Sequence, residues 1–212
     1  MKVDSTAFIE MSKSFGNLTT YKLKGQNIVR RKVTKVANPK TLKQLQQRLR
    51  FALSNKLADC FLQAIVLGLV DRKACLSAAN YFVSLNKDVV TVSKELEATI
   101  DFPAIVVAKG NRAMPEGITL THNAETGAFT VEVEAEEFMS HAADDDEFFC
   151  YVCERTKLKG KLFSLGERGT LTTSTLNLPQ KWDTSPENLA FYVFCVAKDR
   201  KRASNSVYLT VE

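Results

Sequence analysis

The spacing of apolar residues changes from a helical period to a period of two partway along this chain, and that change constrains the fold class. After residue 41 apolar side chains recur every three or four positions, at Leu42, Leu45, Leu49, Ala52, Leu53 and Leu57. This spacing is the apolar stripe of an amphipathic helix. Thr41 with Gln44 three residues on is a capping box, which predicts where that helix begins. Apolar patterns predict further helices at about residues 60–70 and 74–85.

From about residue 98 the pattern alternates. Phe129, Val131 and Val133 are expected to face inward, with Thr130, Glu132 and Glu134 facing water. Further strands are predicted over residues 118–121, 147–154, 160–164, 170–176, 189–197 and 206–211. Residues 189–197 are apolar on both faces, as in a central strand. Short strands at this spacing are typical of an antiparallel β-sandwich.

The first segment predicts a β-hairpin. Residues 18–23 and 28–33 are rich in β-forming side chains, and the four residues between them, Lys24 to Asn27, favour a turn. A single hairpin is marginal in water, so this arm must pack on something else.

The expected fold class is therefore α+β, with an N-terminal β-hairpin arm, an α-helical middle and a C-terminal antiparallel immunoglobulin-like β-sandwich. We expect the basic arm and the helical region to occupy residues 1–111 and the sandwich residues 112–212. The Cys…Trp…Cys signature of a true immunoglobulin domain is missing, because the only tryptophan, Trp182, is predicted to lie in a loop.

Charge is distributed unevenly along the chain. Residues 1–60 contain thirteen Lys and Arg against three acids, whereas residues 113–154 contain eleven Asp and Glu and no Lys or Arg. Two interpretations stay open: two independently solvated faces, or a basic end of one subunit that meets the acidic end of the next. The second predicts contacts between the basic side chains Arg30, Arg31, Lys32 and Lys35 and the acidic side chains Glu132, Glu134, Asp144, Asp145 and Asp146.

The basic stretch between residues 22 and 50 also suggests a second function for the protein. Ten Lys and Arg lie between residues 22 and 50, and such a row can contact nucleic-acid phosphates without reading bases. Tyr21 and Phe51 are the only rings there, so stacking on single strands is not expected. A nucleic-acid-binding accessory protein is thus the second hypothesis, behind docking on protein subunits.

Nothing in the sequence selects an enzyme. The chain contains no nucleophile elbow, phosphate-binding loop or metalloprotease motif. Cys150 and Cys153 lie in a predicted strand, where residues three apart point to opposite faces, so structural core cysteines are expected there and at Cys60, Cys75 and Cys195. Both histidines, His122 and His141, are predicted to lie in loops, and residues 144–147 lack the spacing of a calcium loop, so a solvated acidic loop is expected there. We expect no catalytic residue, metal, cofactor or small-molecule substrate.

The N-terminal residues show no secretory signal, and the longest apolar stretch, residues 60–70, is too short to span a bilayer. Five cysteines without framework spacing suit a reducing compartment. We therefore expect a protein that is cytoplasmic as synthesised and has no membrane partner.

One run of residues resembles a known family. Gly16-Asn17 with Tyr21-Lys22, then Gly25 and Val29-Arg30, then Asn38-Pro39-Lys40-Thr41 to Gln44 and Arg48 are similar to the opening of an uncharacterised bacterial family, a domain of unknown function. Residues 78–86 also resemble it. The resemblance implies no activity, cofactor or site residue. The resemblance implies relatives in phage and mobile-element gene sets. The expected role is a non-enzymatic subunit of a larger assembly, with a virion component (capsid-associated, connector or tail) as its concrete form. The sandwich part is similar in outline to fibronectin type III and immunoglobulin-like modules.

Overall fold

The computed structural model describes residues 14–23, 26–35, 38–123, 126–134 and 140–211. The chain separates into two compact units, residues 1–41 and residues 42–212. The predicted turn residues Lys24 and Gly25 lie outside the described residues.

The first unit is a three-stranded antiparallel sheet, which confirms the predicted hairpin arm. It consists of β1 (Ser14–Phe15), β2 (Leu18–Leu23) and β3 (Gln26–Arg31), in the order β1-β2-β3. In the hairpin, Leu18 pairs with Arg31 and Leu23 with Gln26. The short strand β1 was not predicted, and the turn between β1 and β2 contains Gly16 at a φ of +54°, a conformation that suits glycine.

The second unit begins with the predicted helices. They are α1 (Leu42–Cys60), α2 (Leu62–Gly68) and α3 (Ala78–Leu85). Helix α1 starts directly after Thr41, as the sequence predicts. The axes of α1 and α2 differ by 76°, and the single residue between the two helices is Phe61. Within the described residues no single helix is long and apolar enough to cross a bilayer; α1 and α2 reach that length and composition only together, as this bent pair.

A small hairpin follows the helices and was not predicted. Its strands are β4 (Val90–Val92) and β5 (Ala98–Ile100). Helix α1 packs against β4, and the Gln46 side-chain amide donates hydrogen bonds to the carbonyls of Val92 and Ser93, the latter over 2.8 Å. The fully buried part of α1 is confined to its C-terminal half, at Ser54, Leu57 and Ala58. The first half of the predicted stripe is therefore only partly covered, with Leu42 44% exposed.

The remaining strands form the predicted two-sheet antiparallel sandwich. They are β6 (Ile118–Asn123), β7 (Ala128–Val133), β8 (Glu147–Glu154), β9 (Lys159–Glu167), β10 (Thr173–Leu176), β11 (Leu189–Val196) and β12 (Val207–Leu209), with a 3-10 turn at Pro186–Asn188. One sheet has the order β10-β7-β6 and the other β12-β11-β8-β9. Phe129, Val131 and Val133 are buried on β7, as the alternation predicts.

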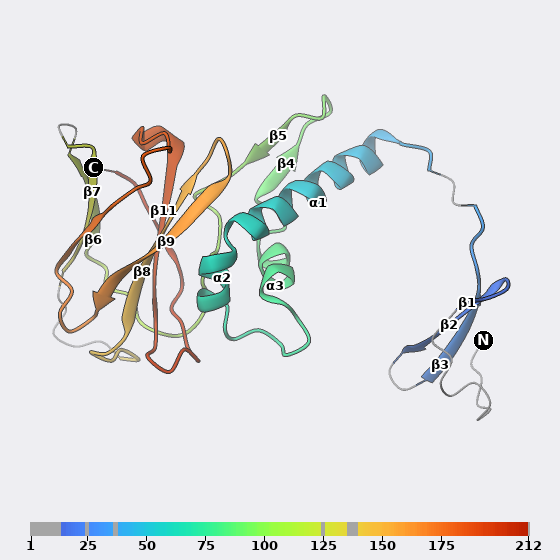
Figure 1. The fold of residues 1–212 in the computed structure, drawn as a ribbon, viewed down its shortest axis with the longest axis horizontal. Helices are drawn as coiled ribbons and strands as arrows, with labels where there is room; N and C mark the ends of the chain where they lie inside the picture. Colours follow the sequence, from blue (N-terminus) through green and yellow to red (C-terminus); the bar gives the residue numbers. More distant parts are fainter. Residues whose placement is uncertain (1–13, 24–25, 36–37, 124–125, 135–139, 212) are drawn as a thin grey trace. The chain divides into compact units, whose positions relative to one another are not determined.

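The central strands β8 and β11 bury side chains on both faces, and this decides how the second unit is layered. Phe148, Cys150 and Val152 belong to the core shared with the opposite sheet. Phe149, Tyr151 and Cys153 belong to a second core that includes residues of all three helices. Figure 1 shows the helices on one side of β8, β9 and β11, with β6 and β7 on the other side.

This layering differs from the expected division at residue 111/112. The helices and the sandwich share a core, and the chain separates after residue 41 instead. The physical reason is that a strand such as β11, buried at every residue, needs an apolar cover on each face. The helices supply one of those covers, so the middle of the chain cannot be a separate region.

Candidate functional site

The basic side chains of the arm lie on β3 and directly after it. Arg30 and Arg31 are the last residues of β3, and Lys32 and Lys35 follow; all four are exposed. Successive strand residues point to opposite faces. Arg30 lies over the Tyr21 ring, with its guanidinium carbon 5.6 Å from the ring centroid, and Arg31 lies on the other face, opposite Leu18. The structure therefore distributes the predicted contact residues over both faces of the arm.

No face of this sheet is buried within the described part of the unit. Every side chain there whose burial is described is half-buried or exposed, and the exposed fractions reach 45% at Leu18, 51% at Leu23 and 66% at Val33. Each face of the hairpin mixes apolar and basic side chains. An isolated sheet of this kind lacks the hydrophobic face that three strands need for independent stability.

Four of the five predicted acidic contact residues are on the surface of the second unit. Glu132 and Glu134 are exposed on β7 and after it, and Asp144 and Asp145 are exposed in the loop before β8. The segment between β9 and β10 contacts both groups. The N–H of Gly169 donates to the carbonyl of Asp144 over 2.9 Å, and the N–H of Val133 donates to the carbonyl of Thr172 over 3.0 Å. This segment therefore lies beside both the end of β7 and the loop before β8.

Asp146 was predicted as the fifth contact residue, and that prediction is wrong. Its side chain is completely buried, with Arg112 Nε 3.6 Å from Oδ1 and Arg168 Nε 3.7 Å from Oδ2. Oδ2 also accepts a hydrogen bond from the N–H of Ala143. The prediction of a solvated acidic loop is therefore only partly correct. Asp146 forms buried ion pairs with Arg112 and Arg168, so its side chain cannot reach another subunit.

Two further sequence predictions need correction. His122 lies in strand β6, with its ring stacked 4.4 Å from the ring of Phe129. Cys75 was expected in a helical core, but it is exposed and precedes α3. His141 does lie in a turn. Among the described residues, no group of three or more His, Cys, Asp or Glu side chains is placed to hold a metal ion.

The cysteines of β8 diverge as the strand period predicts. Cys150 faces the core between the two sheets and Cys153 faces the helices. The sequence did not reveal that Cys153 meets Cys60, the last residue of α1, with 3.6 Å between the two sulfur atoms. Nothing in the local pattern could show this contact, because it joins residues 93 positions apart.

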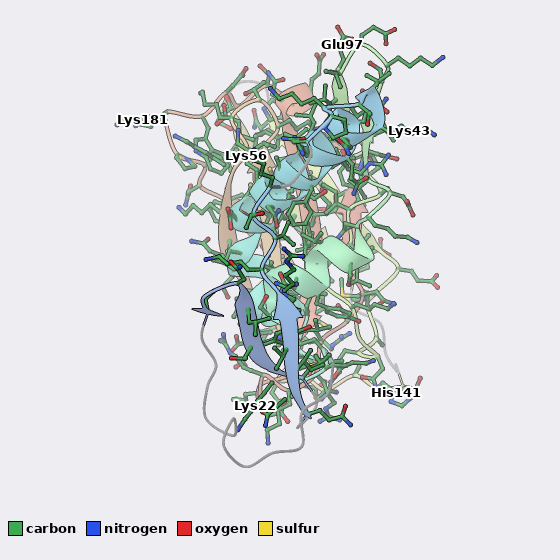
Figure 2. The ribbon with its side chains drawn as sticks, turned by 90° about the vertical axis from the view of Figure 1, so that its right-hand side faces the viewer. Lys22, Lys43, Lys56, Glu97, His141 and Lys181 are labelled. Atoms are coloured by element: carbon green, nitrogen blue, oxygen red, sulfur yellow. The ribbon has the colours of Figure 1, made fainter. Side chains whose placement is uncertain are left out.

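Cys60 lies at the edge of a surface pocket. A hollow of about 490 Å³ is lined by residues of the α1–α2 junction, by residues at the start of β9, and by Trp182 from the loop between β10 and β11: Asp59, Cys60, Leu62, Gln63, Leu158, Lys159, Gly160 and Trp182. A second hollow of about 500 Å³ shares Lys159 and Trp182 with it and adds Lys157, Lys181, Gln180, Pro179 and Glu154. Figure 2 shows Lys181 on an outer loop of the unit, with Glu97 at the tip of the β4–β5 hairpin.

The basic stretch proposed for nucleic acid is accessible along most of its length. The Lys and Arg side chains between residues 22 and 48 that the structure describes are all exposed: Lys22, Arg30, Arg31, Lys32, Lys35, Lys40, Lys43 and Arg48. Arg50, on α1, is half-buried. These residues belong partly to the arm and partly to α1.

Comparison with known proteins gives one match. Searches of the curated proteins and of the solved structures found none, so the likeness of the sandwich to fibronectin type III and immunoglobulin-like modules stays a prediction. The expected relation to an uncharacterised family is confirmed. A family model described as "Family of unknown function (DUF6266)" matches residues 10–210, and the chain belongs to that family.

Proposed function

We propose that this protein is a non-enzymatic subunit of a larger protein assembly and that its N-terminal arm docks on a second copy of the chain. The observation that carries this proposal is the lack of any buried side chain in the described part of the arm. An arm that exposes Leu18 and Leu23 in its sheet and Val33 after it gains stability when another surface covers these side chains.

Charge complementarity supports a second copy as the occupant. The arm presents Arg30, Arg31, Lys32 and Lys35, and the second unit presents Glu132, Glu134, Asp144 and Asp145, all exposed. A basic surface and an acidic surface on different parts of one chain allow a heterologous, head-to-tail contact, which builds rings or filaments. Strand β3 is also an edge strand in the described sheet, and an edge strand can pair with a further strand. The concrete form that we propose for the assembly is a virion.

The test is the oligomeric state of the full chain, measured by sedimentation velocity over a concentration series at low and at high salt. The wild type is expected to associate at low salt and to dissociate as salt screens the contact. The triple reversal Arg30→Glu, Arg31→Glu, Lys32→Glu should abolish association. A matched reversal of three exposed lysines elsewhere, Lys87→Glu, Lys94→Glu and Lys109→Glu, should leave it unchanged.

A charge swap makes this test specific. Glu132→Lys, Glu134→Lys and Asp144→Lys should also abolish association. Mixing this variant with the arm variant should restore association in which the two variants alternate, because the basic arm of one meets the acidic surface of the other and the two reversed surfaces also attract each other. A wild type that stays monomeric at high concentration, or an arm variant that associates normally, contradicts the proposal.

The alternative is a nucleic-acid-binding accessory protein, which the exposure of the basic side chains between residues 22 and 48 favours. It predicts binding to duplex DNA at low salt, with an affinity that falls steeply as salt rises because each phosphate contact releases counterions. The arm variant should weaken this binding and the control variant should not. Undetectable binding at low salt excludes the alternative.

A further inference from the structure

The contact between Cys60 and Cys153 has the parts of a thiol redox site. Cys60 ends α1 and is half-buried, and it lines the pocket. Cys153 is completely buried on β8. Their sulfur atoms lie 3.6 Å apart, and a bond of about 2.05 Å would require them to approach further. One thiol of the pair therefore lines a surface hollow, and its partner is buried behind the surface.

Aromatic packing holds Cys60 in this place. Phe61, which follows it, is completely buried, with its ring 4.9 Å from the ring of Tyr151 and 5.3 Å from that of Tyr192. The Tyr151 hydroxyl donates a hydrogen bond to the carbonyl of Cys60. Tyr151 and Cys153 lie two residues apart on the same face of β8, so the strand presents both groups to the end of α1.

The thiols are also electronically unequal. The hydrogen bond with the Cys153 thiol lowers the pKa of Cys60, although burial acts in the opposite direction. The same hydrogen bond, together with burial, raises the pKa of Cys153. Either sulfur can donate in the contact between the two thiols, and the Cys153 thiol also donates to the carbonyl of Glu154. Because its pKa is lowered, Cys60 is the thiol of the pair that more readily forms the thiolate, which is the nucleophilic form of cysteine.

The two hollows beside Cys60 are lined by three lysines and by two carboxylates, Asp59 and Glu154, so cationic side chains are in the majority. Lys159 borders both hollows, and Lys157 and Lys181 line the second one, as does Trp182. Lys157 is engaged by the buried carboxylate of Glu154, with Nζ 3.0 Å from Oε1. Lys159 and Lys181 are exposed, so their ammonium groups are available to carboxylates of a bound molecule, beside the flat surface of the indole.

We propose that Cys60 and Cys153 form a redox-active thiol pair that reacts with a low-molecular-weight disulfide bearing carboxylates, held over Cys60 by Lys159, Lys181 and Trp182. The Cys60 thiolate attacks one sulfur of the ligand disulfide, which forms a mixed disulfide and releases one ligand thiolate. Cys153 then gives up its proton and attacks the Cys60 sulfur, which forms the Cys60–Cys153 disulfide and releases the second ligand thiolate. Two electrons pass from the cysteine pair to the ligand. The two released ligand thiolates take up the proton that Cys153 gives up and a solvent proton, which balances the one that Cys60 lost when it formed the thiolate.

The product would link the end of α1 covalently to β8. A transient disulfide of this kind is compatible with a reducing compartment, where such bonds serve redox sensing or catalysis. Cys150 and Cys195 are buried elsewhere in the sandwich core, so they do not compete for the ligand. Cys75 is exposed and would react as an isolated thiol.

The experiment uses the full-length protein with Cys75→Ser, reduced and then freed of reductant, with oxidised glutathione as the anionic probe. Peptide mapping by mass spectrometry should find a Cys60–Cys153 cross-link. Cys153→Ser in this background should accumulate one glutathionyl group on Cys60. Cys60→Ser should leave Cys153 unmodified. If both thiols of the Cys75→Ser protein are still reduced after this treatment, the proposal is overturned, and this result does not depend on whether the Cys60→Ser and Cys153→Ser variants fold.

A second measurement tests the ligand site. Trp182 is the only tryptophan, so its fluorescence reports the course of the reaction. Lys159→Glu with Lys181→Glu should slow oxidation by glutathione disulfide about tenfold, because the lysines concentrate an anionic ligand. The same variant should react with cystamine, a cationic disulfide, at least as fast as the wild type does. The control pair Lys94→Glu and Lys109→Glu should change neither rate, and equal slowing by both pairs contradicts a specific site.

Discussion

The carboxylate of Asp146 lies 3.6 Å from the Nε atom of Arg112, and the two side chains are 0% and 10% exposed. Arg168 approaches the second carboxylate oxygen from the other side, with 13% of its side chain exposed. The cluster joins the residue before β8 to the segment that precedes β6 and to the end of β9. Three parts of the second unit that are distant in sequence therefore depend on one buried negative charge.

Asp146→Asn should destabilise the protein by about 3–5 kcal/mol, because it leaves two nearly buried guanidinium groups without their counter-charge. The free energy of unfolding, measured by urea denaturation, checks this. Asp145→Asn is the matched control, since Asp145 is the exposed neighbour in the same loop, and its effect should stay within about 0.5 kcal/mol. Equal stability of the two variants would contradict a structural role for Asp146.

Asn86 makes three hydrogen bonds at the end of α3 while 4% exposed. Its amide nitrogen donates to the carbonyls of Phe82 and Val106 over 3.0 Å, and its Oδ1 accepts from the N–H of Val106 over 2.7 Å. Asn86→Ala should cost at least about 2 kcal/mol, because it leaves buried backbone groups unpaired. The exposed Asn80→Ala on the same helix should cost less than about 1 kcal/mol. Thermal unfolding of both variants distinguishes these values.

Phe61 and Phe51 offer a comparison within one helical region. Phe61 is 0% exposed and packs on Phe82, Tyr151 and Tyr192, whereas Phe51 is 58% exposed on α1. Phe61→Ala should lower the free energy of unfolding by about 3–5 kcal/mol. Phe51→Ala should have an effect of less than about 1 kcal/mol. If Phe51→Ala has a large effect only when the protein is assembled, Phe51 lies in a contact between subunits.

Asp183 gives a prediction about pH. Its carboxylate accepts hydrogen bonds from the N–H and hydroxyl of Ser185 and from the amide of Asn188, and these bonds hold its pKa below the ordinary value for aspartate. Because the folded-state pKa is the lower one, the stabilisation is complete above the unfolded-state pKa of about 3.9 and is lost as pH falls through the folded-state pKa. A carbon-detected NMR titration should show Asp183 protonating below pH of about 3.9. A midpoint at or above that value would contradict the hydrogen-bonded loop, and Asp183→Asn should remove the pH dependence of Trp182 fluorescence in this range.

The longer helices and strands of the second unit could be predicted from the sequence, because their apolar periods and flanking residues are local signals. Strand β8 covers residues 147–154 as predicted, and helix α1 begins after Thr41. Alternation along β7 identified its buried side chains. Period and turn-forming residues act within a few positions, so they can be recognised in a single sequence.

The tertiary structure decided which of these elements meet. The β4–β5 hairpin lies where the sequence shows no clear period, and it forms beside α1, to which the Gln46 amide binds. The acidic loop looks uniform in sequence, but Asp146 is drawn inside by Arg112 and Arg168 while Asp144 and Asp145 stay exposed. The apolar sequences of β8 and β11 require a cover on both faces, but they do not say that the helices provide one of them.

The same distinction applies to the thiol site. The strand period correctly places Cys150 and Cys153 on opposite faces of β8. Successive side chains of a strand point to opposite faces, so two residues three positions apart do so as well. The contact of Cys153 with Cys60 depends on the bend at Phe61 and on the packing of that ring against Tyr151 and Tyr192. This contact depends on packing between residues that are distant in sequence. It therefore forms only in the folded chain and cannot be recognised in the local pattern of residues.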